Sequence, residues 1–194
     1  MTRVLFIGAD AADRGTVQGW AEEGLLPHID RLMRSGATAD VEVPDAFYVG
    51  AVWPSFYTAC APTRHGRYCF KQYSPGSYKA RTVTPGIVPQ DAFWTALDAA
   101  GRRVAILDVP KSRPMPLRHG IQVADWGTHD PERLGFATVP ARLADEIRAR
   151  FGEDPVGNCD RVRRDADGYR RFLANLNARI ATKEAMARHF MDGM

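Results

Sequence analysis

"VLFIGADAAD", residues 4–13, starts with a run of apolar residues that stops at a glycine, an alanine and an aspartate, Asp10. A short apolar run rich in β-branched residues and without alternation is typical of a strand that is covered on both faces, as in a parallel sheet. We therefore expect a central strand at Val4–Ile7, with a carboxylate close to its end.

Further predicted helices and strands follow along the chain. Apolar residues at helical spacing, interrupted by Gly24 and Pro27, predict two short helices that end at Gly36. Further strands are expected at 37–43, 104–109 and 120–124, and further helices at 53–60, 89–100, 138–151 and 165–191. Alternating strands and helices predict an α/β fold with a mostly parallel sheet and helices on both faces. We expect one domain, 1–194, with a hairpin excursion at 67–84.

Composition and charge restrict the function classes. The 194 residues carry a net charge of +3, and no segment is apolar over a membrane-spanning length. We therefore expect no membrane as partner. The one dense basic stretch, 161–164, has no interleaved aromatic residues, so we do not expect a nucleic acid as partner either. Three cysteines without C-x-x-C spacing argue against a disulfide framework and a zinc knuckle. A cytoplasmic protein without a signal peptide is the expectation.

Carboxylates recur where predicted strands end. Asp10, Asp108 and Asp125 all lie at or just after such an end. In open parallel sheets the ligand crevice lies outside the carboxyl ends of the strands, so these three side chains could share one rim. A carboxylate held there is an oxygen ligand for a divalent cation, and Asp10 is the first candidate. The alternative is a helix cap, in which Asp10 or Asp13 accepts N–H groups of the following helix.

Two segments carry a resemblance to a known family. "VLFIGADAADRGTVQGWAEEGLLPHIDRLMRSGATADVEV" and the later "WPSFYTACAPTRHGRY" resemble the type I phosphodiesterase/nucleotide pyrophosphatase branch of the alkaline phosphatase superfamily. Strand, G-x-D, "LPHIDRLMRSG", strand and a W-x-S-F-x-T-x-x-x-P-x-x-H-G segment follow in the family's order. The resemblance covers about the first eighty residues well and the remainder only by element order. It implies an alkaline-phosphatase-like fold, of which this chain would be an incomplete N-terminal part.

The resemblance also implies an activity. It implies hydrolysis of small phosphate esters with two divalent cations, Zn²⁺ or alternatively Mn²⁺, and with a hydroxyl nucleophile that is transiently phosphorylated. Asp10 matches the first metal-ligand aspartate of the family. The family's nucleophile position falls on Val49, which has no hydroxyl group, and Tyr48 is its neighbour. Ser55 is the nearest hydroxyl within the motif and our candidate nucleophile; its alternative is a capping role in the first turn of a helix.

The sequence also leaves alternatives to a metal-dependent hydrolase. The family's remaining ligands belong to a later part of a longer chain, and the five histidines here form no H-x-x-x-H pair. A truncated or degenerate module without turnover is therefore the alternative function. A Rossmann-type nucleotide binder is disfavoured because "IGADAADRG" lacks G-x-G-x-x-G spacing.

The remaining candidate residues have structural interpretations as well. Thr58 and His65 are expected to be structural. Three further residues could either face a substrate or only support turns and solvent contacts: Lys111, Arg113 and His129.

Overall fold

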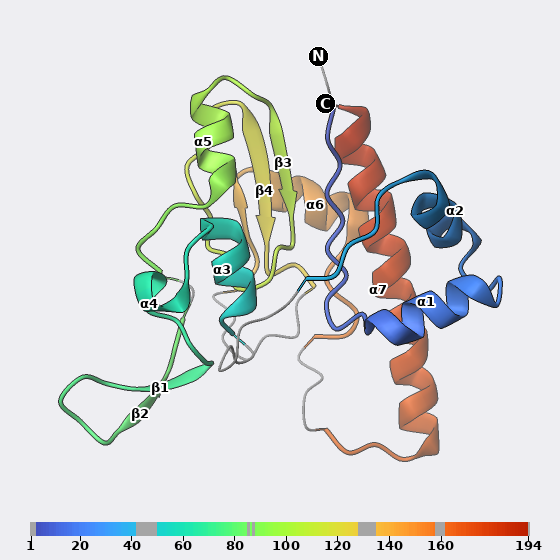
Figure 1. The fold of residues 1–194 in the computed structure, drawn as a ribbon, viewed down its shortest axis with the longest axis horizontal. Coiled ribbons are helices and arrows are strands. Elements are labelled where there is room, and N and C mark those ends of the chain that lie inside the picture. Colours follow the sequence, from blue (N-terminus) through green and yellow to red (C-terminus); the bar gives the residue numbers. More distant parts are fainter. Residues whose placement is uncertain are drawn as a thin grey trace. The chain divides into compact units, whose positions relative to one another are not determined.

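The computed structural model describes residues 3–41, 50–84, 86, 88–127, 135–157 and 162–193 (Figure 1). The chain forms two compact units, Met1–Asp45 and Ala46–Met194. We describe each unit by itself. The single domain expected over 1–194 stays a prediction.

The first unit contains two short helices, α1 (Arg14–Glu22) and α2 (Pro27–Ser35), which confirms the prediction of a helix pair. Helix α1 starts at an N-cap, Asp13, whose Oδ1 accepts hydrogen bonds from the backbone N–H and the hydroxyl of Thr16, both at 2.8 Å. Proline at the first position of α2 suits a helix start, since its missing N–H would have no intrahelical partner there. The backbone N–H of Gly36 donates to the carbonyl of Leu32 and ends α2.

The predicted strand at Val4–Ile7 is wrong. These residues form no strand, and their exposed fractions range from 62% to 88%. Residues 37–41 are not a strand either, and positions 42 and 43 lie outside the described residues. An apolar run favours burial, but a strand exists only where a neighbouring strand accepts and donates its backbone hydrogen bonds. Among the described residues of this unit no such neighbour occurs.

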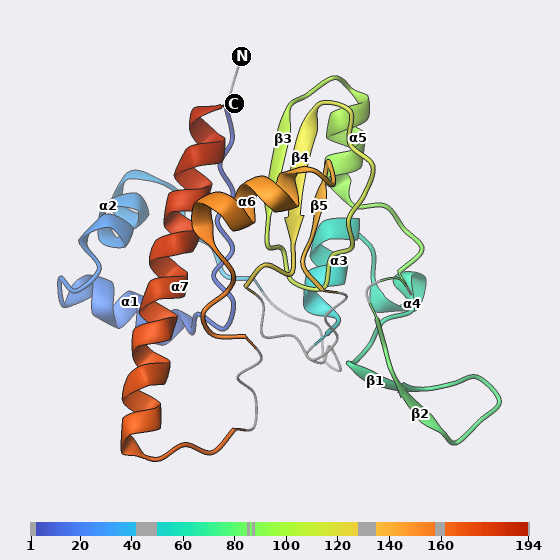
Figure 2. The same cartoon turned by 180° about the vertical axis from the view of Figure 1, so that it is seen from behind.

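The second unit contains a three-stranded sheet in the order β3-β4-β5 (Figure 2). Its strands are β3 (Val104–Leu107), β4 (Gly120–Ala124) and β5 (Ala137–Val139). β3 and β4 run parallel, with Val104 opposite Gly120, while β5 is antiparallel to β4. A Cβ atom at Gly120 would overlap the carbonyl oxygen of Val104, so this pairing requires glycine. The strand predicted at 120–124 is confirmed, and the one predicted at 104–109 ends two residues early.

The predicted fold class is therefore wrong. Instead of one large, mostly parallel sheet with helices on both faces, the described chain has a three-stranded mixed sheet and a two-stranded hairpin. The difference has a local cause, because the runs at 4–7 and 37–41 are not in a sheet, and β5 follows β4 as an antiparallel neighbour rather than through a crossover helix.

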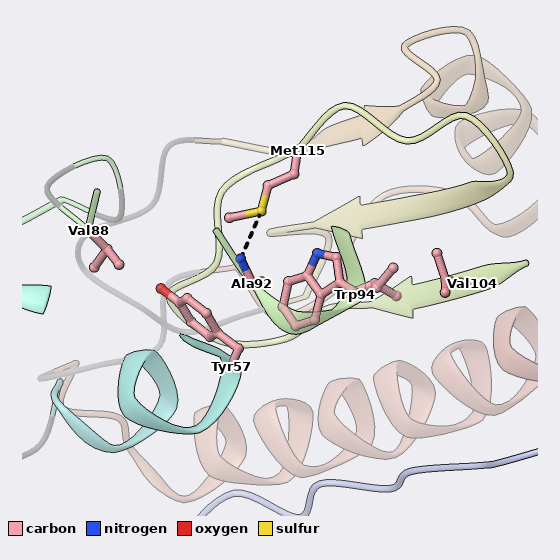
Figure 3. Close-up of a cluster of buried hydrophobic side chains, with 7 residues drawn as sticks. Tyr57, Val88, Ala92, Trp94, Val104 and Met115 are labelled. Atoms are coloured by element: carbon pink, nitrogen blue, oxygen red, sulfur yellow. Dashed lines mark hydrogen bonds between the residues drawn. The ribbon is translucent and has the colours of Figure 1, made fainter. Parts of the chain in front are cut away.

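Two apolar clusters form the core of the second unit. One packs the sheet against α6 (Leu143–Phe151) and α7 (Ala166–Asp192). Helix α7 agrees with the helix predicted at 165–191, whereas the helix predicted at 138–151 starts five residues late, because positions 138 and 139 belong to β5. The other, shown in Figure 3, contains Tyr57, Val88, Ala92, Trp94, Val104, Ile106 and Met115. In this second cluster the backbone N–H of Ala92 donates to the sulfur of Met115 at 3.4 Å.

Helix α5 (Phe93–Ala99) presents a different face to the core than its sequence predicts. In the helix predicted at 89–100, the apolar spacing puts Phe93, Leu97 and Ala100 on one stripe, and such a stripe is expected to face the core. However, Phe93 and Leu97 are 44% and 43% exposed. The buried residues are Trp94 and Asp98. The carboxylate of Asp98 accepts backbone N–H groups of the segment before β4, from Arg118 at 2.8 Å and His119 at 2.6 Å. These hydrogen bonds satisfy a buried carboxylate that apolar periodicity alone would place outside.

The remaining elements precede this core. They are α3 (Val52–Thr58), α4 (Pro62–His65) and a hairpin of β1 (Lys71–Tyr73) and β2 (Ala80–Thr82), which lies within the stretch 67–84. Among the helices of the described residues, none combines the length and the apolar character that a membrane crossing needs.

Candidate functional site

Two of the candidate carboxylates lie at the same edge of the sheet. Asp108 directly follows β3, and Asp125 directly follows β4. Both residues have a left-handed backbone, with φ of 50° and 56°, and the backbone N–H of Asp108 donates to the carbonyl of Val123 at 2.9 Å. Non-glycine residues with positive φ are uncommon and occur often at functional sites and tight turns. Asp10 belongs to the other unit, where it lies in an exposed turn.

The carboxylate of Asp108 is held by three donors. It accepts the backbone N–H of Trp126 on Oδ1 at 2.8 Å and that of Gly127 on Oδ2 at 2.9 Å. The Nζ of Lys183, on α7, lies 2.9 Å from the same Oδ2, and the Asp108 side chain is only 9% exposed. Asp108 therefore joins the end of β3, the turn after β4 and α7. This use of the carboxylate is structural, and no sequence pattern pointed to Lys183.

A second ion pair involves α7, and this pair is buried on both sides. Arg179 donates from Nε to Oδ1 of Asp154 at 2.7 Å and from a terminal nitrogen to Oδ2 at 2.6 Å. The two side chains are 10% and 6% exposed. Burial raises the pKa of Asp154, but hydrogen bonds from Arg179 and from the backbone N–H groups of Val156 and Gly157 outweigh it and hold this pKa below its usual value. Asp154 is therefore ionised at neutral pH.

Ser55, the candidate nucleophile, lies beside His65. Its Oγ is 2.9 Å from Nε2 of His65, so a hydrogen bond joins α3 to the end of α4. The other ring nitrogen, Nδ1, accepts the backbone N–H of Arg67 at 3.2 Å. Because a backbone N–H can only donate, Nδ1 carries no proton, and the neutral ring must hold its proton on Nε2. The imidazole therefore donates to the serine oxygen.

The surroundings of His65 keep its ring neutral. The residue is fully buried. Burial lowers the pKa of His65, and the nearby positive charge of Arg67 lowers it further. A neutral ring in this tautomer cannot take the proton of Ser55, but its N–H would stabilise a negative charge on the serine oxygen. His65 also has the structural role expected of it, because it connects the two helices.

The structure shows which hydroxyl groups of α3 serve the helix itself. Ser55 is the fourth residue of α3, whose N-cap is Ala51, and no side chain caps this helix. The capping role considered for Ser55 is therefore wrong. Thr58 Oγ1 donates to the carbonyl of Pro54 at 2.6 Å, which confirms that Thr58 serves the helix backbone.

The metal ligands stay a prediction. Among the described residues, no group of three or more His, Cys, Asp or Glu side chains is placed to hold a metal ion. In the first unit the capping role goes to Asp13, while Asp30 pairs with Arg34 and Asp40 with Arg14. Zinc sites in proteins need at least three protein ligands. The described residues of neither unit supply such a set by themselves, so no reaction step can be derived through a cation.

Three of the remaining candidates lie outside the described residues: Tyr48, Val49 and His129. Lys111 has a left-handed backbone with φ of 59°, and its carbonyl accepts the hydroxyl of Tyr57 at 2.9 Å. Burial raises the pKa of Tyr57 to about 12, although the charges of Arg67 and Arg113 oppose it. Arg113 also lies 3.5 Å from a carboxylate oxygen of Asp91. Neither Lys111 nor Arg113 is therefore shown to bind a phosphate.

Comparison with protein-family models, with curated proteins and with solved structures finds no match to this chain. The resemblance to the phosphodiesterase branch of the alkaline phosphatase superfamily therefore stays a prediction.

Proposed function

We propose that this chain serves the metal-dependent hydrolysis of small phosphate esters, with Ser55 as nucleophile and Asp10 as a ligand of a divalent cation, Zn²⁺ or Mn²⁺. The observation that carries the proposal is the 2.9 Å hydrogen bond between Ser55 and His65. It places an N–H donor against the hydroxyl of Ser55, the candidate nucleophile of the motif. The resemblance of residues 4–43 and 53–68 to the phosphodiesterase family supports the same activity.

The chain's own residues would act on the serine oxygen. In the attack a bond forms between the serine oxygen and phosphorus, the bond from phosphorus to the alkoxide leaving group of the ester breaks, and the serine proton passes to water. A donor aimed at the serine oxygen stabilises the negative charge that it carries once it has lost this proton. His65 supplies this donor without competing for the proton, because its other nitrogen is occupied by the N–H of Arg67. A divalent cation, when bound, would polarise the phosphoryl oxygens and lower the pKa of the attacking hydroxyl. A cytoplasmic location belongs to this proposal, supported by two free thiols, Cys60 and Cys69.

Metal content and turnover test the proposal together. Zinc and manganese are measured in the purified chain, and hydrolysis of bis(p-nitrophenyl) phosphate is followed with each metal added. We expect Asp10→Asn to lower metal content and Ser55→Ala to abolish turnover while leaving the metal bound. Glu23→Gln and Ser35→Ala, at exposed positions of the first unit, are controls that should change neither quantity. Full turnover by Ser55→Ala would contradict the assigned nucleophile.

The second candidate function is a non-catalytic module of the same family. The tautomer of His65 favours it, because the ring cannot act as the base for Ser55. A chain that binds neither zinc nor manganese and shows no turnover under these conditions would support the module and contradict the hydrolase.

A further inference from the structure

The sequence around the hairpin has an uneven distribution of charge. Between Asp45 and Asp91 there is no acidic residue, although this stretch contains five arginines and lysines: Arg64, Arg67, Lys71, Lys79 and Arg81. The last three lie on the hairpin and are exposed. None of these three makes an ion pair with a residue that the structure describes. The hairpin is therefore a local concentration of positive charge in a chain whose net charge is small.

Two aromatic rings accompany these cations. Tyr73, in β1, is 70% exposed, and Tyr78, just before β2, is fully exposed. Because side chains two residues apart in a strand lie on the same face, Tyr73 shares its face with Lys71. The register places Ala80 opposite Tyr73, so a small residue leaves the ring accessible from the neighbouring strand.

The base of the hairpin is anchored, although its outer part is exposed. The side-chain oxygen of Gln72 accepts the backbone N–H of Tyr68 at 2.7 Å, and its amide donates to the carbonyl of Gly66 at 3.0 Å. At the tip, Pro75 and Gly76, whose φ is 71°, are the central residues of a turn that is closed by a hydrogen bond from the backbone N–H of Ser77 to the carbonyl of Ser74 at 3.0 Å. Figures 1 and 2 both show β1 and β2 extending away from the sheet β3-β4-β5. The rings and cations are thus presented on a defined support.

We propose that this hairpin binds single-stranded nucleic acid, with bases stacked on Tyr73 and Tyr78 and phosphates paired with Lys71, Lys79 and Arg81. Exposed aromatic rings next to cations are the combination that binds single strands without sequence preference. An acidic peptide would pair with the cations but would not need the rings. A membrane surface would need larger apolar side chains at the tip, which carries Ser74, Pro75, Gly76 and Ser77 instead.

The proposal differs from the expectation drawn from the whole sequence. That expectation considered the net charge of +3 and the basic stretch 161–164, which lacks aromatic residues. The hairpin, by contrast, combines cations with aromatic rings within eleven residues, 71–81. Binding here does not depend on the proposed hydrolysis, since none of the hairpin residues is Ser55 or Asp10.

Fluorescence anisotropy with a labelled twenty-residue oligothymidine tests the proposal. The titrations contain EDTA, so that a metal-dependent hydrolase cannot cleave the probe, and they are repeated at several salt concentrations. We expect the logarithm of the association constant to fall with the logarithm of salt with a slope of about −2, since three cations each contribute roughly −0.7 on single strands. Lys79→Gln should reduce the slope to about −1.4.

Matched variants separate the hairpin from the rest of the surface. Tyr78→Ala should weaken binding about fivefold or more, as expected for the loss of one stacked base. Tyr169→Ala and Arg171→Gln, at exposed positions of α7, are the aromatic and charge controls and should change affinity less than twofold. Circular dichroism confirms that each variant is folded.

Three outcomes would overturn the proposal. The first is an absence of binding to oligothymidine at low salt. The second is an equal loss of affinity in the hairpin variants and in the α7 controls, which would indicate non-specific attraction. The third is binding of polyglutamate or of phosphatidylglycerol vesicles, lost in Lys79→Gln but kept in Tyr78→Ala, without binding of the oligonucleotide. Failure of the hydrolysis assay with intact oligonucleotide binding would contradict only the proposed activity.

Discussion

The segments "VLFI" at 4–7 and "VAIL" at 104–107 have nearly the same composition and opposite structures. Val104 and Ile106 are 9% and 6% exposed within β3, whereas Val4 and Ile7 are 88% and 77% exposed in a segment that forms no strand. β3 pairs with β4 along all four of its residues. The comparison shows that an apolar run favours burial, whereas pairing with a neighbouring strand decides whether the run becomes part of a sheet.

The aspartates that follow these two runs differ in the same way. Asp108 comes directly after β3, and its carboxylate is held by two backbone N–H groups and by Lys183. Asp10, three residues after the run at 4–7, lies in an exposed turn. A carboxylate at the end of a paired strand meets the donors of the neighbouring turn, whereas Asp10 follows a run that is not part of a sheet. The two aspartates therefore differ in burial despite similar sequence surroundings.

The largest expected effect comes from the buried ion pair of the second unit. Asp154→Asn leaves the charge of Arg179 buried, and this should lower the free energy of unfolding by about 3–5 kcal/mol. In the first unit, Asp30→Asn breaks a pair whose Arg34 side chain is 75% exposed, and it should cost at most about 0.5 kcal/mol. Urea unfolding measures both changes, and equal losses would contradict the contrast between the units.

The same pair makes a pH prediction. The pKa of Asp154 is lower in the folded than in the unfolded chain, so its stabilising contribution is present above the unfolded value of about 4 and is lost as the pH falls through the folded value. Urea midpoints measured at falling pH should therefore decline more steeply for the parent chain than for Asp154→Asn.

A matched pair of isoleucines tests the contrast between the two apolar runs. Ile106→Ala removes a buried side chain from β3 and should lower the free energy of unfolding by about 2–4 kcal/mol through lost burial and a residual cavity. Ile7→Ala, at a position that is 77% exposed, should change it by at most about 0.5 kcal/mol. A loss above 2 kcal/mol for Ile7→Ala would show that the run at 4–7 is buried in solution.

A smaller effect is expected at alkaline pH, again in the second unit. Tyr57 ionises near pH 12 in the folded chain and near pH 10 when unfolded, because burial disfavours the phenolate. Stability from this group is present below about pH 10 and falls by roughly 2–3 kcal/mol as the pH approaches 12. Urea midpoints should show this decline in the parent chain and in the control Tyr78→Phe but not in Tyr57→Phe. A decline that persists in Tyr57→Phe would contradict the assignment.

The sequence was informative where local chemistry decides the structure. Proline and glycine signals located α1 and α2, and the apolar run at 120–124 located β4. Periodicity failed at α5, because hydrogen bonds to Asp98 turn a carboxylate inward. In the candidate site, Ser55 was identified from a motif, but its contact with His65 depends on two helix ends that meet in space. Lys183 and Arg179 could not be found, since their partners are distant in sequence.

By itself the sequence determined the short helices with their ends, the apolar runs that favour burial and the segment without acidic residues that contains the hairpin. Only the tertiary structure decided which apolar run is a strand, which carboxylates pair with cations of α7 and which nitrogen of His65 carries the proton. The physical reason is that caps, turns and charge depend on residues a few positions apart. Strand pairing, burial and tautomers depend on which distant groups come within hydrogen-bonding distance.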